Sequence, residues 1–230
     1  MEGLSRFSDY EIFAYVTVGA VALLVSDMAF GTHFIAGALW TVPDGAAILI
    51  GSYVLGQAIA SPAAWILERQ LVHRLLRAPS STLFGEAKPG PIRRWLFRGY
   101  YAPLSAHLKT LVERKARANG ASLHGEDLFW AAFVQAKRDA HAADRLGAFI
   151  RLYGFCRNLT FVAACATFIF IAELITDIRH GAAQAAASDE LRGAVALAVC
   201  VAMLFRYLKF YRAYSVEVFA TYAAGDGKAE

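Results

Sequence analysis

The stretch "RLYGFCRNLTFVAACATFIFIAELITDIRH", residues 151–180, decides the fold class of this chain. Two arginines, Arg151 and Arg157, precede its apolar run, and two carboxylates, Glu173 and Asp177, lie at its far end. The apolar part, residues 159–175, is long enough for a helix that crosses the hydrocarbon core of a bilayer. The stretch therefore predicts a membrane-spanning helix whose two ends differ in charge.

Three further apolar segments make the same prediction for the rest of the chain, which is 57% hydrophobic over 230 residues. The predicted spans cover about residues 12–30, 46–67, 159–176 and 191–208. A soluble protein of this size cannot bury four such helices on all sides. The fold class predicted is an all-α polytopic membrane protein with four transmembrane helices.

The distribution of Lys and Arg predicts the orientation of these spans. Residues 68–158 hold sixteen of them, residues 30–45 hold none, and residues 176–190 hold only Arg179. Because cationic loops stay in the cytoplasm, both termini and the long middle segment are predicted to be cytoplasmic. We expect a multi-pass protein of a bacterial inner membrane, because the alanine- and arginine-rich composition of the chain suits a bacterial source.

The predicted organisation follows from these spans. Residues 1–67 form an N-terminal transmembrane pair, and residues 68–158 form a cytoplasmic helical domain between spans two and three. Residues 159–212 form a second transmembrane pair, and residues 213–230 form a cytoplasmic tail. Spans two, three and four are each predicted to extend as helices into the cytoplasm, because helical patterning continues beyond each apolar run. Helical spacing predicts one cytoplasmic helix over residues 92–120, ended by Asn119-Gly120, and another that begins at Ser122.

Helix two carries a ridge of small residues at successive i+4 positions: Ser52, Gly56, Ala60 and Ala64. Small side chains let helix backbones approach closely in a bilayer, where no hydrophobic force drives helices together. The ridge predicts either packing against helix one or three of the same chain, or a contact between subunits.

Carboxylates near the outer ends of helices one and three are the first candidate site. Asp27 and Glu173 are predicted at similar depths, and His33 and Asp177 are the nearest candidates on the outer face. Charged groups at such depths usually face protein or a watery cavity. Three alternatives stay open: each carboxylate caps a helix end and reaches water, the group binds an ion or a proton, or a carboxylate pairs with Arg179 or Arg192.

Arginines at the predicted inner face are the second candidate site. Anionic phospholipid headgroups are their expected partner, and a nucleotide or polyphosphate is the alternative. No glycine-rich phosphate loop supports the alternative. The residues concerned are Arg69, Arg74, Arg77, Arg93, Arg94, Arg98, Arg157, Arg206 and Arg212.

Several classes of function lack any signal in the sequence. The three cysteines, Cys156, Cys165 and Cys200, form no C-x-x-C pair, and the histidines lack the spacing of metal ligands. No G-x-S-x-G elbow is present. No cofactor, metal or nucleic-acid partner is predicted, and an enzyme is less expected than a binding or channel-like protein.

Three functions are consistent with these patterns. The first is a homo-oligomeric channel-like or membrane-perturbing protein with a basic cytoplasmic vestibule. The second is a membrane anchor or sensor whose cytoplasmic helices recruit a soluble partner through exposed aromatic residues such as Trp95, Tyr100, Tyr101 and Trp130. The third is a lipid-modifying enzyme that uses Asp27, His33 and Glu173 at the outer interface.

Overall fold

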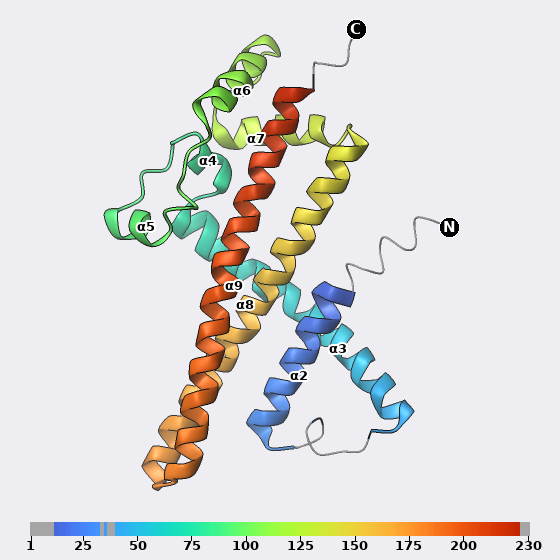
Figure 1. Ribbon diagram of the computed structural model, residues 1–230, viewed down its shortest axis with the longest axis vertical. Helices are drawn as coiled ribbons and strands as arrows, with labels where there is room; N and C mark the ends of the chain where they lie inside the picture. The colour runs from blue at the N-terminus through green and yellow to red at the C-terminus, as the bar shows by residue number, and fades with distance from the viewer. Residues whose placement is uncertain (1–11, 33–34, 36–39, 226–230) are drawn as a thin grey trace. The chain divides into compact units, whose positions relative to one another are not determined.

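The computed structural model describes residues 12–32, 35 and 40–225 (Figure 1). Within these residues every regular element is a helix and no strand occurs, which confirms the all-α class. The elements in chain order are η1 (Ile12–Val16), α2 (Thr17–Phe30), α3 (Val42–Ala63), η2 (Ala64–Leu76), α4 (Pro79–Leu83), α5 (Pro91–Leu96), α6 (Ala106–Ala118), α7 (Gly125–Ala136), α8 (Ala140–His180) and α9 (Ala183–Ala224).

Three helical stretches are long and apolar enough to cross a membrane: Val42–Leu83, Ala140–His180 and Ala183–Ala224. Each contains one of the predicted spans, those over 46–67, 159–176 and 191–208. The predicted span over 12–30 falls on a shorter apolar helix, Ala14–Phe30. By length and composition, therefore, the chain has the helices of a multi-pass membrane protein.

The described chain divides into two compact units. Unit 1 contains the described residues up to Leu67 together with Gly154–Arg206. Unit 2 contains Glu68–Tyr153 together with the described residues from Tyr207 onward. Helices α8 and α9 therefore each contribute residues to both units.

In unit 1, two glycines bring η1 and α2 into backbone contact with α3. A Cβ atom built on Gly19 would lie 1.7 Å from the carbonyl oxygen of Ser52, and one built on Gly56 would lie 2.0 Å from that of Tyr15. Only a residue without a side chain fits at either position. The structure thus places Ser52 and Gly56 of the small-residue ridge against the first helix of the same chain.

The rest of that ridge turns away from the contact. Ala60 and Ala64 are half-buried, while Ile59, Ala63 and Leu67 are buried. A strict i+4 series rotates about 40° per step around a helix of 3.6 residues per turn. The buried face therefore continues at alternating spacings of three and four residues.

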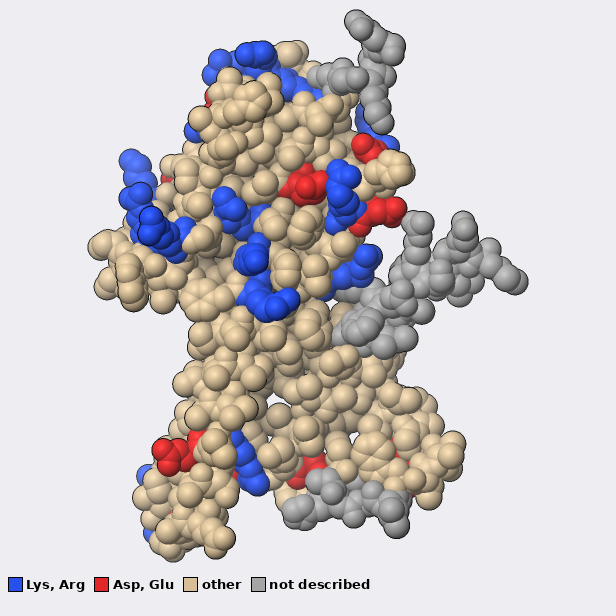
Figure 2. Space-filling model, viewed as in Figure 1, with Lys and Arg blue, Asp and Glu red and all other residues tan. Residues whose placement is uncertain are grey.

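The outside of unit 1 is covered by apolar side chains. Large ones are exposed on α3, α8 and α9, and Figure 2 shows a broad uncharged surface over these helices on the face drawn. Helices that are apolar on the outside as well as the inside are typical of a protein surrounded by lipid. The exposed residues include Leu49, Ile50, Val54, Phe168, Leu191 and Val195.

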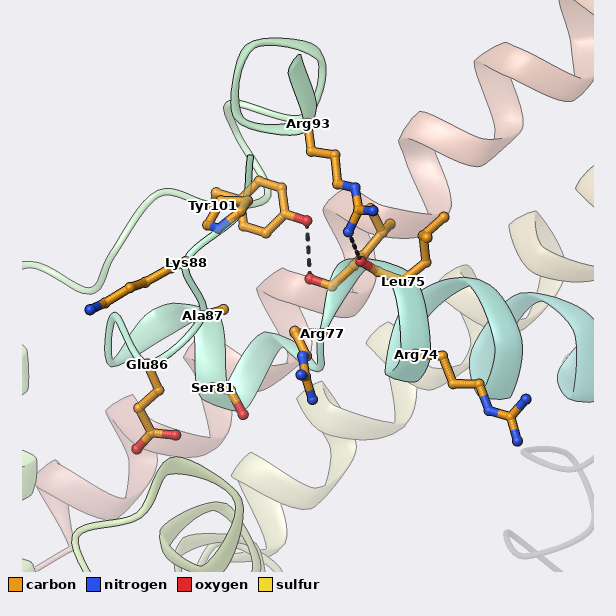
Figure 3. Close-up of a pocket in the computed structure, with 11 residues that line it drawn as sticks. Arg74, Leu75, Arg77, Ser81, Glu86, Ala87, Lys88, Arg93 and Tyr101 are labelled. Carbon is orange, nitrogen blue, oxygen red and sulfur yellow. Dashed lines mark hydrogen bonds between the residues drawn. The ribbon is translucent and has the colours of Figure 1, made fainter. Parts of the chain in front are cut away.

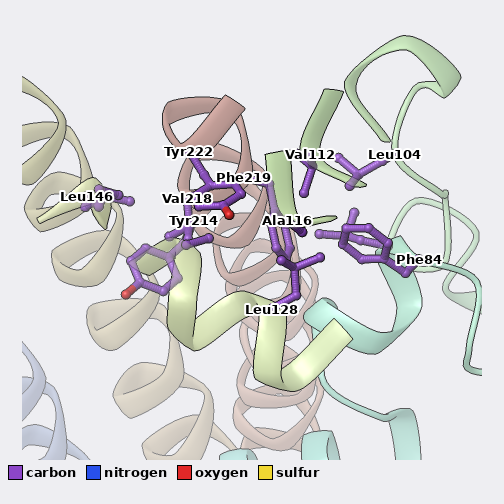
Figure 4. Packing of buried hydrophobic residues seen from close by; sticks show 13 residues of the cluster. Phe84, Leu104, Val112, Ala116, Leu128, Leu146, Tyr214, Val218, Phe219 and Tyr222 are labelled. Carbon is purple, nitrogen blue, oxygen red and sulfur yellow. The ribbon is translucent and has the colours of Figure 1, made fainter. Parts of the chain in front are cut away.

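Unit 2 has a hydrophobic core of its own (Figure 4). Helix α9 supplies Tyr214, Val218 and Tyr222, which follow one another at i+4 spacing, and Phe219 beside them. These side chains pack with buried residues of α4, α6, α7 and α8, including Leu83, Val112, Ala116, Leu128 and Leu146. The prediction that the last span continues as a helix beyond its apolar run is confirmed, since α9 extends through Ala224.

The segment predicted as one helix between residues 92 and 120 is two helices instead. Helix α5 ends at Leu96, turns occupy residues 97–101, and α6 begins at Ala106 with the Ser105 hydroxyl accepting a hydrogen bond from the Leu108 N–H. Pro103 explains part of this break, because a proline disfavours helical backbone in the residue before it. The predicted end of the second helix at Asn119-Gly120 is confirmed, with Gly120 at φ +63°.

The helix predicted from residue 122 also differs. Helix α7 begins at Gly125 with Glu126 and Asp127 in its first turn, and ends at Ala136. A new helix starts at Ala140 because the Asp139 carboxylate accepts hydrogen bonds from the backbone N–H groups of His141 and Ala142, at 2.9 and 3.2 Å. From there α8 is continuous into unit 1.

Candidate functional site

A cavity of about 480 Å³ in unit 1, called the outer cavity here because it holds residues predicted for the outer face, brings charged residues of α8 and α9 together. Glu173 and Asp177 of α8 line it with Asp189 and Arg192 of α9, beside the end of α2. Arg192 donates a hydrogen bond from Nη1 to the Asp189 carboxylate at 3.0 Å. Sequence reasoning did not single out Asp189, although its spacing of three residues from Arg192 was a usable signal.

Asp27 does not share this cavity. It is 6% exposed, and its carboxylate accepts hydrogen bonds from the Thr32 hydroxyl and, at 3.1 Å, from the Ile35 N–H. Asp27 and Ile35 line a different pocket, which is mainly apolar. The carboxylate therefore holds Thr32 and Ile35 close to the end of α2, but it is buried and does not reach water as the helix-end alternative required. His33 lies outside the described residues.

The outer cavity contains Glu173 and Asp177, two of the residues predicted for an ion or proton site. Three carboxylates face one guanidinium, and only Asp189 is paired with it. Within the described ranges, no group of three or more His, Cys, Asp or Glu side chains is placed to hold a metal ion. A tightly bound metal therefore has no ligand set there, whereas a weakly held cation or a shared proton fits.

A second cavity lies in unit 2, at the end of the helix that leaves the second predicted span. Helix η2 stops at Leu76 because Arg77 adopts a left-handed conformation, with φ +70°, and Pro79 begins α4. The last carbonyl groups of a helix lack helical partners. Side chains supply these partners: Arg93 donates from Nη1 to Leu75 O at 2.8 Å, and Tyr101 donates to Leu76 O at 3.0 Å.

Tyr100 completes this arrangement. Its hydroxyl donates to the carbonyl oxygen of Arg77 at 2.7 Å. The side chain is 4% exposed, and burial raises the pKa of the phenol above its ordinary value. The expectation that Tyr100 belongs to an exposed partner surface was therefore wrong, while Trp95 and Trp130 of that surface are 81% and 58% exposed.

The cavity has a volume of about 600 Å³ and is rich in cations (Figure 3). Arg74, Arg77 and Arg93, three of the arginines of the second candidate site, line it. The structure adds Lys88, Ser81 and Tyr101, which sequence reasoning did not assign to the site. Lys88 carried the usable signal, because it lies in the same acid-poor segment as the arginines.

The two units divide the remaining predicted arginines between them. Arg157 and Arg206 belong to unit 1, where Arg157 Nε donates to Asn158 Oδ1 at 3.1 Å. Arg69, Arg94 and Arg212 belong to unit 2. Arg212 donates to the Ala102 carbonyl at 2.9 Å and so fixes the turn before α6 to α9.

Comparison of the chain with protein-family models, with curated proteins and with solved structures finds no match. The functional argument therefore rests on the chemistry of the two cavities and on the core of unit 2.

Proposed function

We propose that the chain is a four-span inner-membrane protein that anchors unit 2 at the cytoplasmic face as a binding platform. Three long apolar helices support the membrane assignment. The fourth span is η1 with α2, about 28 Å of helix at about 1.5 Å per residue, close to the hydrocarbon thickness of about 30 Å. The lysine and arginine distribution supports cytoplasmic termini.

The hydrophobic core of unit 2 carries this proposal. A loop that only linked two spans would not need buried aromatic residues, whereas Phe219 and Tyr222 are almost completely buried among four other helices. A packed core gives a fixed surface, which is what recognition of a partner requires. On that surface Trp130 and Val134 of α7 are 58% and 57% exposed, one helical turn apart. Exposed aromatic residues of this kind are typical of protein contact sites.

The orientation is tested by cysteine labelling in a background without the three native cysteines. Ser122→Cys, in an exposed loop of unit 2, should react with an impermeant maleimide only from the cytoplasmic side of membrane vesicles. Ser188→Cys, exposed near the start of α9, should react only from the opposite side. Labelling of both positions from one side would contradict the four-span arrangement.

Partner binding is tested by a photo-crosslinking residue at position 130 in intact cells. We expect a discrete crosslinked species with one soluble protein, because Trp130 lies on the exposed face of α7. Arg138, exposed just after α7, is the matched control and should give no such species. Equal crosslinking from both positions would mean that α7 has no specific partner.

A channel-like homo-oligomer is the second candidate, and the outer cavity favours it. Glu173 and Asp177 lie where cations would collect before entering a membrane pathway. Proteoliposomes should then pass cations, and Glu173→Gln should reduce the flux at unchanged protein content. A monomeric protein that passes no cations in proteoliposomes would contradict the channel-like function and favour the binding platform. The engaged carboxylate of Asp27 disfavours the outer-face lipid enzyme.

A further inference from the structure

We propose that the basic cavity of unit 2 is a binding site for a phosphate-bearing anion. The inference deepens the platform function proposed above, on which it rests, by assigning the class of ligand. The cavity is enclosed by the end of η2, by α4, by the loop before α5 and by Tyr101 (Figure 3). Its volume of about 600 Å³ falls within the range of small-ligand sites, about 300–1,000 Å³.

The charge of the cavity is strongly unbalanced. Four cationic side chains line it, those of Arg74, Arg77, Lys88 and Arg93, against one carboxylate, Glu86. Within the part of the chain that the structure describes, the side chains of Arg74, Arg77 and Lys88 make no ion pair or hydrogen bond. Four cations around one cavity with a single carboxylate give it a positive potential, which favours an anion there.

The single acid does not neutralise these cations. Glu86 Oε1 accepts a hydrogen bond from the Gly125 N–H at 2.8 Å and lies 3.7 Å from Nδ1 of His124. Its role is to hold the start of α7. The surrounding sequence repeats the imbalance, since residues 69–112 contain eight Lys and Arg residues and Glu86 is their only acid. The excess of positive charge is therefore a property of the whole segment.

The walls of the cavity are held before any ligand binds. Arg93 and Tyr101 are tied to consecutive carbonyls of η2, and Tyr100 is tied to the next one. Arg93 uses one N–H of its five for Leu75 O, which leaves donors on the same guanidinium for a ligand. Arg93 and Tyr101 are therefore positioned before a ligand binds, and these two side chains lose little entropy on binding.

Phosphate is the anion that this donor set fits best. Guanidinium groups bind phosphate oxygens through paired N–H donors, and a lysine adds a compact point charge. A phosphate group can come from a soluble molecule or from a lipid headgroup. The lipid source has a specific basis, because Ile92 and Trp95 are exposed on α5 beside Arg93. The experiment therefore has two arms.

The first arm titrates inorganic pyrophosphate into the full-length protein in a neutral detergent, by calorimetry. We expect saturable binding that weakens as sodium chloride is added, because salt screens the cations. Arg77→Gly should weaken it at least about tenfold, the loss expected for one charge-assisted hydrogen bond. Glycine keeps the left-handed backbone at φ +70°, so this variant removes the charge and retains the turn.

Two further variants keep this arm decisive. Lys88→Ala removes a second cation from an exposed loop and should also weaken binding, which tests the site independently if Arg77→Gly folds poorly. Arg114→Ala is the matched control, because Arg114 is an exposed cation of α6 that does not line the cavity. It should bind pyrophosphate as the wild type does.

The second arm places the protein in nanodiscs of phosphatidylcholine, with or without phosphatidylglycerol, and measures acylation of lysine amines by mass spectrometry. A lipid headgroup in the cavity should protect Lys88 from acylation only in discs that contain the anionic lipid. The exposed Lys137 should be acylated equally in both kinds of disc. Arg77→Gly should abolish this protection. Saturable pyrophosphate binding that depends on Arg77 and Lys88 indicates a soluble phosphate instead.

Absence of both effects, or equal weakening by Arg114→Ala, would overturn the assignment of the anion site. Neither readout depends on which side of the membrane holds unit 2. Failure of the anion site is therefore distinguishable from failure of the four-span topology, which cysteine labelling tests.

Discussion

Alanine at Gly56 should separate the first two helices of unit 1. Its Cβ atom would lie 2.0 Å from the carbonyl oxygen of Tyr15 and 2.6 Å from the carbonyl carbon, whereas real contacts of this kind stay beyond 3.0 Å. The obstacle is backbone, which cannot rotate aside as a side chain does. One helix must move by roughly 1 Å, and packed interiors resist displacements of that size.

The magnitude follows from two opposing effects. Overpacking costs about 1–3 kcal/mol, and a backbone clash belongs at the upper end of that range. Alanine gains about 1 kcal/mol over glycine from its higher helix propensity. We expect Gly56→Ala to lower the free energy of unfolding by about 2 kcal/mol.

Gly51→Ala is the matched control, because it lies in the same helix and gains the same propensity. The nearest atom to its Cβ is Leu23 Cδ1 at 3.8 Å, an ordinary contact. Gly51→Ala should therefore be neutral or stabilising, and the two variants should differ by about 3 kcal/mol, the overpacking cost alone. The assay is unfolding by sodium dodecyl sulfate in mixed micelles, followed by circular dichroism.

Equal unfolding curves for the two variants would refute the close approach of α2 and α3. A change in oligomer mass for Gly56→Ala, with an unchanged unfolding midpoint, would instead indicate that the small-residue ridge is a contact between subunits.

Four other substitutions test the remaining contacts. Phe219→Ala should lower the thermal stability of unit 2 by about 3–5 kcal/mol, because it empties a fully buried aromatic site. Asp27→Ala should cost about 1–3 kcal/mol in the unfolding of unit 1, since it leaves two donors without an acceptor. Arg145→Ala should cost less than about 1 kcal/mol in the unfolding of unit 2, because its 2.6 Å pair with Glu217 is solvent-exposed. Tyr100→Phe should reduce the loss of stability at alkaline pH. The raised pKa of Tyr100 stabilises the fold fully below about pH 10 and progressively less above it, because the phenol of the unfolded chain then ionises. An unchanged alkaline profile would mean that another group governs this loss.

The membrane helices were predictable from sequence because a bilayer leaves few choices. Backbone polar groups in hydrocarbon must be satisfied within a helix, so apolar length alone predicts the spans over 46–67, 159–176 and 191–208. The helix end at Asn119-Gly120 was predictable for a local reason, the left-handed backbone that Gly120 adopts.

The helices of unit 2 were less predictable, because distant residues determine where they end. The carbonyls at the end of η2 find their partners in Tyr100 and Tyr101, 23 and 25 residues later. No local pattern reveals such a pairing. It takes Tyr100 out of the exposed surface on which its aromatic character had placed it.

The candidate sites show the same division. Depth along a helix grouped Asp27 with Glu173, but the two line different cavities. Depth could not show that the Thr32 hydroxyl and the Ile35 N–H bind the Asp27 carboxylate. Arginine clustering indicated the basic segment around residues 69–98. It could not tell which cations line one cavity, because that depends on the turn at Arg77.

The left-handed arginine at the end of η2 has a consequence for laboratory evolution. A residue with a side chain loses about 1–2 kcal/mol of stability in this left-handed conformation, and glycine does not. Glycine loses more conformational entropy on folding, which offsets about 0.5–1 kcal/mol of that difference. Selection for heat resistance alone should therefore recover glycine at position 77. Variants with glycine at position 77 would be more stable to heat than the parent, yet they would have lost a positive charge from the cavity. Thermal stability and ligand binding would therefore be opposed at a single codon.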